Sequence, residues 1–233
     1  NTTQTEWNLA RRQIVGNAAS IGFAVAMYGV SFGALGTTTG LSIPQTMALS
    51  LLMFTGASQF TLVSTLASGG TALTAVIASW LMGTRNAAYS MRMTPILKTS
   101  GPGRLVAVQL TIDESTAMGL AQDEEAFEGR ASRLAFWATG LSVYLLWNLA
   151  TFIGAVSVSA IGDPKSFGLD AAIAAGLFAL VWPQIKSQID LSVAFGGALI
   201  ALALTPVVPP GVPVLAAAIV AIIVGWVTGR KLS

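Results

Sequence analysis

The chain of 233 residues contains no cysteine and no histidine, and charged residues make up only 9% of it. Without cysteine and histidine there can be no disulfide, no thiolate or imidazole metal site, and no Ser-His or Cys-His catalytic pair. We therefore expect neither an enzyme nor a cofactor or metal site. A soluble domain has about a quarter of its residues charged, so this chain has too few charges to cover a surface that faces water.

Long uncharged stretches indicate that lipid covers most of the molecule. Hydrophobic residues make up 54% of the chain and its mean hydropathy is +0.71. No charge occurs in the 72 residues from Gln13 to Thr84, in the 29 from Leu134 to Gly162, or in the 39 from Leu191 to Gly229. A helix needs about 20 apolar residues to cross the hydrocarbon core. Divided at Gly-rich and Pro-rich turns, the chain has hydrophobic segments near residues 14–36, 45–67, 71–93, 132–160, 168–184, 190–206 and 212–229.

These segments predict an all-α polytopic membrane protein with about seven hydrophobic helices, forming a single transport domain over residues 1–233. Helices are favoured over a barrel because barrel strands would alternate in polarity over about ten residues. The partner that composition implies is the lipid bilayer. The net charge of +2 comes from so few groups that it gives no indication of nucleic-acid binding.

Basic residues near both ends predict that both termini lie in the cytoplasm, with residues 1–12 as a cytoplasmic segment. These residues are Arg11, Arg12, Arg230 and Lys231. Two cytoplasmic termini require an even number of crossings. The chain offers an eighth candidate, residues 105–121, inside an otherwise polar connecting region at 98–133. With eight full crossings, the basic loop after the third segment would lie outside, against the positive-inside rule. We therefore favour a broken or re-entrant element among the first three segments.

Small residues recur along one face of the first segment at steps of three and four: Ala18, Gly22, Ala26, Gly29, Gly33, Gly36 and Gly40. Such a face allows another helix to approach closely. An alternative is that residues 33–40 unwind and expose backbone carbonyls to a solute, as in many carriers.

The second segment is unusually polar for a membrane helix, and the side-chain amide of Gln59 is its most informative feature. Ser58 lies on a hydroxyl-bearing face, which either lines a wet path or joins helices. The side chain of Gln59 carries two hydrogen-bond donors and an acceptor. Leaving these groups unpaired in hydrocarbon costs roughly several kcal/mol, so they must bond to protein, water or ligand. Both roles, structural and ligand-binding, stay open.

A cation lies deep in the third segment. Arg85, Tyr89 and Arg92 share one helical face, and Asn86 lies on a polar edge beside it. An arginine within a membrane segment is expected to be functional and to have an acidic partner. The alternative is that the arginines extend towards the lipid phosphates.

Two adjacent acids, Asp113 and Glu114, interrupt the eighth candidate. They can bind a substrate ammonium, pair with Arg85 or carry a proton. The residues 111–114 also fit a capping box in which Thr111 caps a helix and Glu114 returns to its amide. A weak internal similarity, Gly40-Leu41 against Gly168-Leu169, suggests inverted halves with Gln184 opposite Gln59 in one site.

Three segments together resemble the AzlC family: GLSIPQTMALSLLMFTGASQF at residues 40–60, LMGTRNAAYSMRMTPIL at 81–97 and LTIDESTAMGL at 110–120. The first segment contains the Phe54 to Phe60 motif, and Arg85 and the Asp113-Glu114 pair stand at the family's Arg and acidic positions. Ile112 differs, since the family pattern has Thr before the acid. The resemblance implies the large subunit of a bacterial exporter of branched-chain amino acids in the cytoplasmic (inner) membrane, working with a small AzlD-like membrane subunit.

The residues themselves are compatible with this implication. A zwitterionic amino acid needs a cation for its carboxylate and an acid or carbonyl groups for its ammonium, facing each other across a cleft. The alternative is a carrier or channel for another small neutral solute. The expected substrate-binding residues are Gly56, Ser58, Gln59, Arg85, Asn86, Tyr89 and Gln184, and those expected to bind the ammonium or couple transport are Asp113 and Glu114.

Overall fold

The computed structural model describes residues 2–122, 126–161 and 185–208, with a few isolated residues between 178 and 224. All regular structure in these residues is helical, which confirms the predicted all-α class. The chain divides into two compact units, residues 1–59 with 83–164 and residues 60–82 with 165–233. That both units work as a single transport domain stays a prediction.

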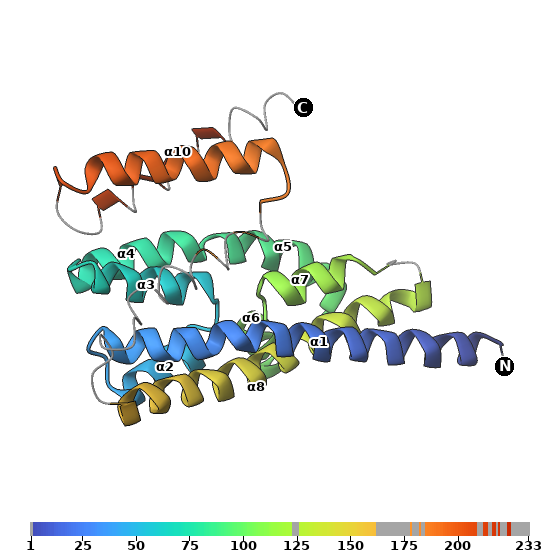
Figure 1. Ribbon diagram of the computed structural model, residues 1–233. Coiled ribbons are helices and arrows are strands. Elements are labelled where there is room, and N and C mark those ends of the chain that lie inside the picture. Colours follow the sequence, from blue (N-terminus) through green and yellow to red (C-terminus); the bar gives the residue numbers. More distant parts are fainter. Residues whose placement is uncertain are drawn as a thin grey trace. The chain divides into compact units, whose positions relative to one another are not determined.

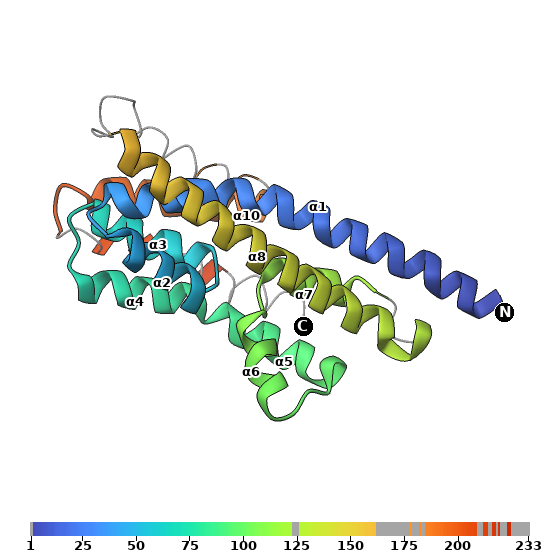
Figure 2. The same ribbon diagram turned by 90° about the horizontal axis from the view of Figure 1, so that it is seen from below.

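Two long helices, α1 (Thr2–Thr38) and α8 (Arg130–Ile161), form the centre of the first unit. They run side by side in both views (Figures 1 and 2). Among the residues that the structure covers, only these two helices are long and apolar enough to cross a bilayer unbroken, over Gln4–Thr38 and Phe127–Val158. The predicted segments 14–36 and 132–160 therefore correspond to single helices.

Small residues bring the backbones of α1 and α8 into contact. A Cβ atom on Gly29 would lie 2.9 Å from the carbonyl oxygen of Trp147, and one on Gly33 would overlap the carbonyl oxygen of Thr151. The same holds from the other side, where a Cβ on Gly154 would overlap the carbonyl oxygen of Val30. The close-packing interpretation of this face is therefore confirmed. The alternative, unwinding over residues 33–40, is wrong because α1 stays helical up to Thr38.

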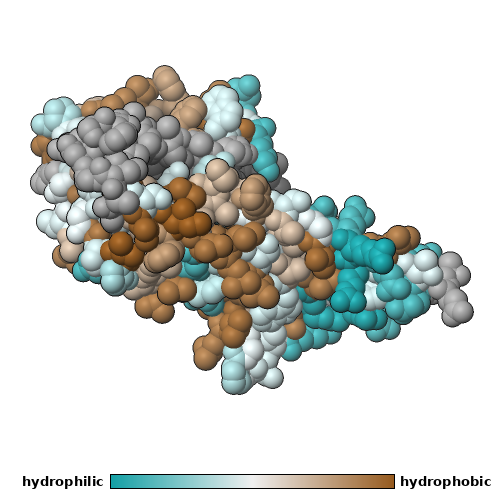
Figure 3. Space-filling view, turned by 60° about the horizontal axis from the view of Figure 1, so that its bottom comes forward, coloured by the Kyte–Doolittle hydropathy of each residue, from teal (hydrophilic) through white to brown (hydrophobic). Residues whose placement is uncertain are grey.

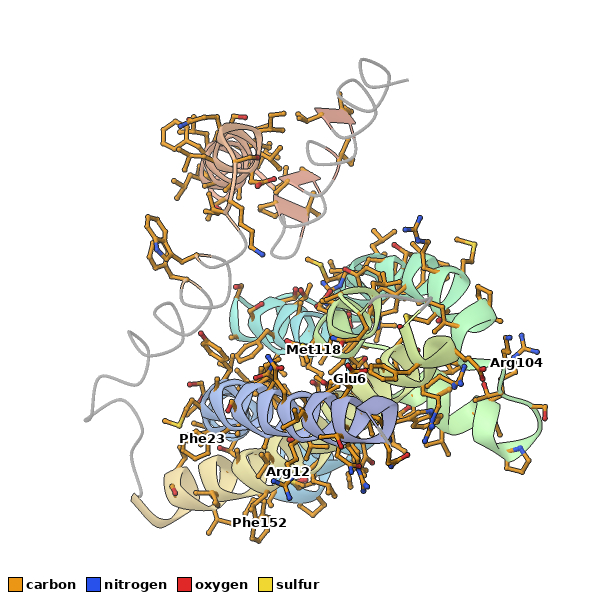
Figure 4. All side chains as sticks on the ribbon, turned by 90° about the vertical axis from the view of Figure 1, so that its right-hand side faces the viewer. Glu6, Arg12, Phe23, Arg104, Met118 and Phe152 are labelled. Atoms are coloured by element: carbon orange, nitrogen blue, oxygen red, sulfur yellow. The ribbon has the colours of Figure 1, made fainter. Side chains whose placement is uncertain are left out.

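The outward faces of this pair are apolar. Phe23 of α1 and Phe152 of α8 are exposed and point away from the two helices (Figure 4). In Figure 3, hydrophilic residues gather at the end where the N-terminal part of α1 lies, and hydrophobic residues cover much of the rest of the coloured face. An apolar exterior with polar residues concentrated at one end suits a protein surrounded by lipid.

The predicted second segment, residues 45–67, is broken into α2 (Ile43–Leu52) and α3 (Ala57–Ala67). Helix α2 starts at a capping box. The backbone N–H of Ser42 donates to Gln45 Oε1 at 2.8 Å, and the backbone N–H of Gln45 donates to Ser42 Oγ at 3.4 Å. Gly56 in the break has a φ of 59°, a left-handed conformation that glycine adopts without strain.

The third and eighth candidates are also interrupted. Residues 71–93 fall into α4 (Ala72–Gly83) and α5 (Arg85–Leu97), and residues 105–121 into α6 (Pro102–Gln109) and α7 (Asp113–Leu120), followed by the short 3-10 helix η1 (Ala126–Gly129). The prediction of broken elements in the early half is confirmed.

The start of α7 differs from the expected capping box. The N-cap residue is Ile112, whose amide donates to Ser115 Oγ at 3.1 Å. Thr111 instead donates its hydroxyl to the Ala107 carbonyl at 2.7 Å. The capping box of Thr111 and Glu114 is therefore wrong, and Glu114 is not used to cap the helix.

The second unit contains most of α3, most of α4, and α10 (Gln188–Leu204). Helix α10 corresponds to the predicted segment 190–206 and begins at Ser187, whose Oγ accepts from the Asp190 amide at 3.1 Å. The predicted segments 168–184 and 212–229 lie almost wholly outside the described residues.

Candidate functional site

An ion pair joins two of the short helices of the first unit. Arg85 Nη2 at the start of α5 donates to Asp113 Oδ2 at the start of α7, at 2.8 Å. The other carboxylate oxygen, Asp113 Oδ1, accepts from the Tyr89 hydroxyl at 2.6 Å. Tyr89 lies one helical turn after Arg85, so both donors come from the same face of α5. Asp113 also benefits from the positive end of α7, which favours an anion in the first turn.

The same guanidinium reaches the broken second segment. Arg85 Nη2 also donates to the carbonyl oxygen of Thr55, at 3.3 Å, in the non-helical stretch between α2 and α3. The side chain of Arg85 is 26% exposed and that of Asp113 is 36% exposed. The pair is therefore sheltered but reachable, and it ties together α5, α7 and the break.

Side chains from elsewhere in the chain form hydrogen bonds with backbone groups at the end of α2 and in the break. Gln59 Nε2 donates to the Leu49 carbonyl at 3.0 Å, while Gln59 Oε1 accepts from the Gly56 amide at 3.1 Å. The Leu51 carbonyl accepts from Gln109 Nε2 at 2.8 Å and from the Tyr144 hydroxyl at 3.3 Å. Non-helical backbone within a membrane protein requires such internal partners, and here they come from three separate parts of the chain.

Several polar atoms around the ion pair have no hydrogen-bond partner within the described part of the chain. These buried atoms are Thr55 Oγ1, Arg85 Nε and Asn86 Oδ1. The other end of the Asn86 amide is engaged, since Nδ2 donates to the Thr111 carbonyl at 3.2 Å. A Cβ built on Gly56 would lie more than 4 Å from every described atom outside its chain neighbours, which leaves open space beside the break. Buried polar groups are normally paired, and unpaired ones beside open space indicate a place for a polar ligand or water.

The structure brings most of the predicted site residues together. Hydrogen bonds join Asp113 to both Arg85 and Tyr89, and Asn86 follows Arg85 in α5 and donates to Thr111. Gly56 lies next to Thr55, whose carbonyl accepts from Arg85. The expected cleft between the two charges is absent, because Arg85 and Asp113 are in direct contact.

The remaining predicted residues have other positions. Ser58 is buried beside the break. Gln59 is fully buried, and its amide is used by the backbone of the break. Glu114 is half-buried and forms no ion pair with any described residue. Gln184, and with it the predicted opposition to Gln59, lies outside the described residues.

Two partners of the break, Gln109 and Tyr144, were not among the predicted site residues. The signal that could have found Gln109 is an amide in an otherwise apolar stretch, LVAVQL at residues 105–110, since an amide there needs a partner. Tyr144 shows no comparable sequence signal, because a tyrosine in an apolar helix is commonly a packing residue. Its ring also packs edge-on against Phe54, with ring centroids 4.9 Å apart.

Broken helices that meet at a charged, partly reachable site within an apolar exterior are typical of helical membrane transporters. The chain belongs to the AzlC protein family, whose model matches residues 20–161. This range includes the ion pair and every partner of the break. AzlC proteins are a transporter-type membrane family associated with branched-chain amino-acid transport. Neither a curated protein nor a solved structure matches the chain.

Proposed function

We propose that this protein exports the branched-chain amino acids valine, leucine and isoleucine across the bacterial cytoplasmic membrane, with the ion pair of Arg85 and Asp113 as the substrate site. The observation that carries the proposal is the contact at 2.8 Å between these two charges, bordered by unpaired polar atoms. An amino acid carries one negative and one positive group close together. The two side chains therefore present the charges that both ends of an amino acid require.

The closed pair suggests how substrate binds. Separating two sheltered charges is costly unless each one gains a new partner. A zwitterion supplies both partners at once, its carboxylate to Arg85 and its ammonium to Asp113. An uncharged solute would leave both side chains unpaired, which is why we favour an amino acid over another small neutral solute.

The unpaired atoms complete this arrangement. Arg85 Nε is a free donor for a second carboxylate oxygen, and Asn86 Oδ1 and Thr55 Oγ1 are acceptors for ammonium protons. The aliphatic part of the proposed substrate follows from the family association. Tyr89 holds Asp113 in place through its hydroxyl.

We further propose proton coupling through Glu114, and a small AzlD-like membrane subunit as partner. Glu114 follows Asp113 in the first turn of α7 and is half-buried beside the ion pair. An ionisable group in this position is the type of residue that carries protons in membrane carriers. The basic residues near both ends support a cytoplasmic location for both termini.

Counterflow of labelled leucine in vesicles, with and without the small subunit, tests the proposal. We expect Arg85→Ala and Asp113→Asn each to lower counterflow at least tenfold, about 1.4 kcal/mol of lost binding. The reversed pair, Arg85→Asp with Asp113→Arg, should regain part of it. Arg104→Ala is the matched control because Arg104 of α6 is exposed and points away from the protein (Figure 4).

Two leucine analogues separate the proposal from its alternative. Leucinamide lacks the carboxylate and 4-methylvalerate lacks the ammonium, so both should compete poorly with leucine. If both analogues compete as well as leucine, or if Arg85→Ala and Asp113→Asn leave counterflow unchanged at equal protein levels, the zwitterion site is wrong.

A further inference from the structure

A second site in the first unit lies away from the ion pair, between α5, the end of α7, η1 and the start of α8. It is a cavity of about 610 Å³, which falls within the usual range for small-molecule sites. Three cationic side chains line it, Arg92 and Lys98 from α5 and its end, and Arg133 from α8. The proposed transport site uses none of these residues.

The described side chains that line this cavity carry more positive than negative charge. Among them, Glu128 is the one acid, against three cations. In the part of the chain that the structure describes, the ion pair of Arg85 and Asp113 is the only one, so neither Arg92, Lys98 nor Arg133 is neutralised by a described carboxylate. Arg133 Nη2 donates to the backbone carbonyl of Glu128 at 3.2 Å, which holds the guanidinium at the cavity wall without cancelling its charge.

Local backbone conformation shapes the cavity. Lys98 ends α5 in a left-handed conformation with a φ of 51°, and Glu128 has a φ of 55°. Non-glycine residues rarely adopt positive φ. Both residues line the cavity, which brings together cations from α5 and α8 that are more than 30 positions apart in the sequence.

The rim of the cavity is apolar. Met91 is 72% exposed and Leu120 is 36% exposed, and both line the cavity together with the exposed Pro95. A free anion in water gains nothing from exposed apolar neighbours. A phospholipid does, because its headgroup phosphate and its acyl chains need both kinds of surface in adjacent positions.

We infer that this cavity binds the headgroup phosphate of an anionic phospholipid, with Arg92, Lys98 and Arg133 as its ligands. Guanidinium groups bind phosphate oxygens through paired N–H donors, and the lysine adds a point charge. The acyl chains lie against Met91 and Leu120. The inference does not depend on the proposed substrate or direction of transport.

Native mass spectrometry of the purified full chain, titrated with phosphatidylglycerol and with phosphatidylcholine, tests this inference. We expect the wild type to retain phosphatidylglycerol at least tenfold more strongly. Each cation near a membrane surface contributes roughly a fivefold gain in affinity. The triple variant Arg92→Gln, Lys98→Gln, Arg133→Gln should therefore lose on the order of 100-fold, whereas Arg104→Gln should retain the wild-type preference.

A variant in the opposite direction keeps the test decisive if the triple variant folds poorly. Glu128→Gln removes the acid of the cavity and should raise phosphatidylglycerol affinity about fivefold. Equal losses in the triple variant and in Arg104→Gln would show a general surface-charge effect and overturn the site. Displacement of the lipid by millimolar inorganic phosphate would show that a free anion, and not a lipid, is the ligand. If the wild-type protein binds phosphatidylglycerol as expected but shows no leucine counterflow, only the proposed transport function is contradicted.

Discussion

The α1–α8 pair and the group of short helices beside it, α2, α5 and α7, differ in how they satisfy their backbones. In the pair, continuous helices bond their own carbonyl groups and meet through glycines such as Gly33 and Gly154. In the short helices, backbone groups at the breaks are bonded by side chains: Gln109 and Arg85 donate to carbonyl groups, and Gln59 accepts from the Gly56 amide. The difference shows that shape complementarity stabilises the first region and directional polar contacts stabilise the second.

The largest effect is expected from disrupting the contact between α1 and α8. Gly33→Leu would force a side chain into the Thr151 carbonyl and within 2.8 Å of the Ala155 amide nitrogen. Overpacking against backbone should cost about 3 kcal/mol and greatly reduce the yield of monodisperse protein in detergent. Gly16→Leu on the same helix is the control because its Cβ would meet no atom within 4 Å. Equal yields for the two variants would contradict backbone contact.

An intermediate effect is expected at the break between α2 and α3. Gln59→Leu leaves the Gly56 amide without its acceptor and removes the second donor to the Leu49 carbonyl. We expect a loss of about 2 kcal/mol, which corresponds to a fall in Tm of roughly 4–8 °C for a chain of this size.

The matched control for the break is Gln109→Leu. The Leu51 carbonyl keeps its Tyr144 donor in this variant. The free energy of unfolding, measured by thermal melting, should therefore change by less than about 0.5 kcal/mol. A larger loss in Gln109→Leu than in Gln59→Leu would mean that the break depends on α6 more than on its own amide.

The smallest effect is expected at the partly exposed ion pair. Tyr89→Phe removes the hydroxyl that donates to Asp113 at 2.6 Å and keeps the ring. We expect the free energy of unfolding to fall by about 1 kcal/mol. In an Asp113→Asn background the same change should have a smaller effect, as a double-mutant cycle from melting curves would measure. Equal effects in both backgrounds would show that the Tyr89 hydroxyl does not act through the Asp113 carboxylate.

The sequence predicted the two regions to different extents. The α1–α8 contact was predictable because small residues at steps of three and four mark a helix face that another helix can approach. Arg85 and Asp113 were also recognisable, since charges within apolar segments need partners. Their direct contact was one of several roles that the sequence allowed.

The positions of the breaks were not predictable in the same way. Residues 45–67 form one uncharged stretch, and the break at 53–56 is accompanied by donors from Arg85, Gln109 and Tyr144. Tertiary contacts of this kind carry no local signature. The start of α7 illustrates the same limit, because Ile112 and Ser115 fulfil the role that local pattern assigned to Thr111 and Glu114.

Backbone contact between α1 and α8 has a mechanical consequence. Two helices whose carbonyl groups meet at Gly33 and Gly154 cannot slide along each other without collision. Among the described helices of the first unit, we therefore expect rearrangement in the short helices, where hydrogen bonds can exchange partners one at a time. We expect the long pair to act as the fixed frame of the carrier and the α2–α3 break as its hinge.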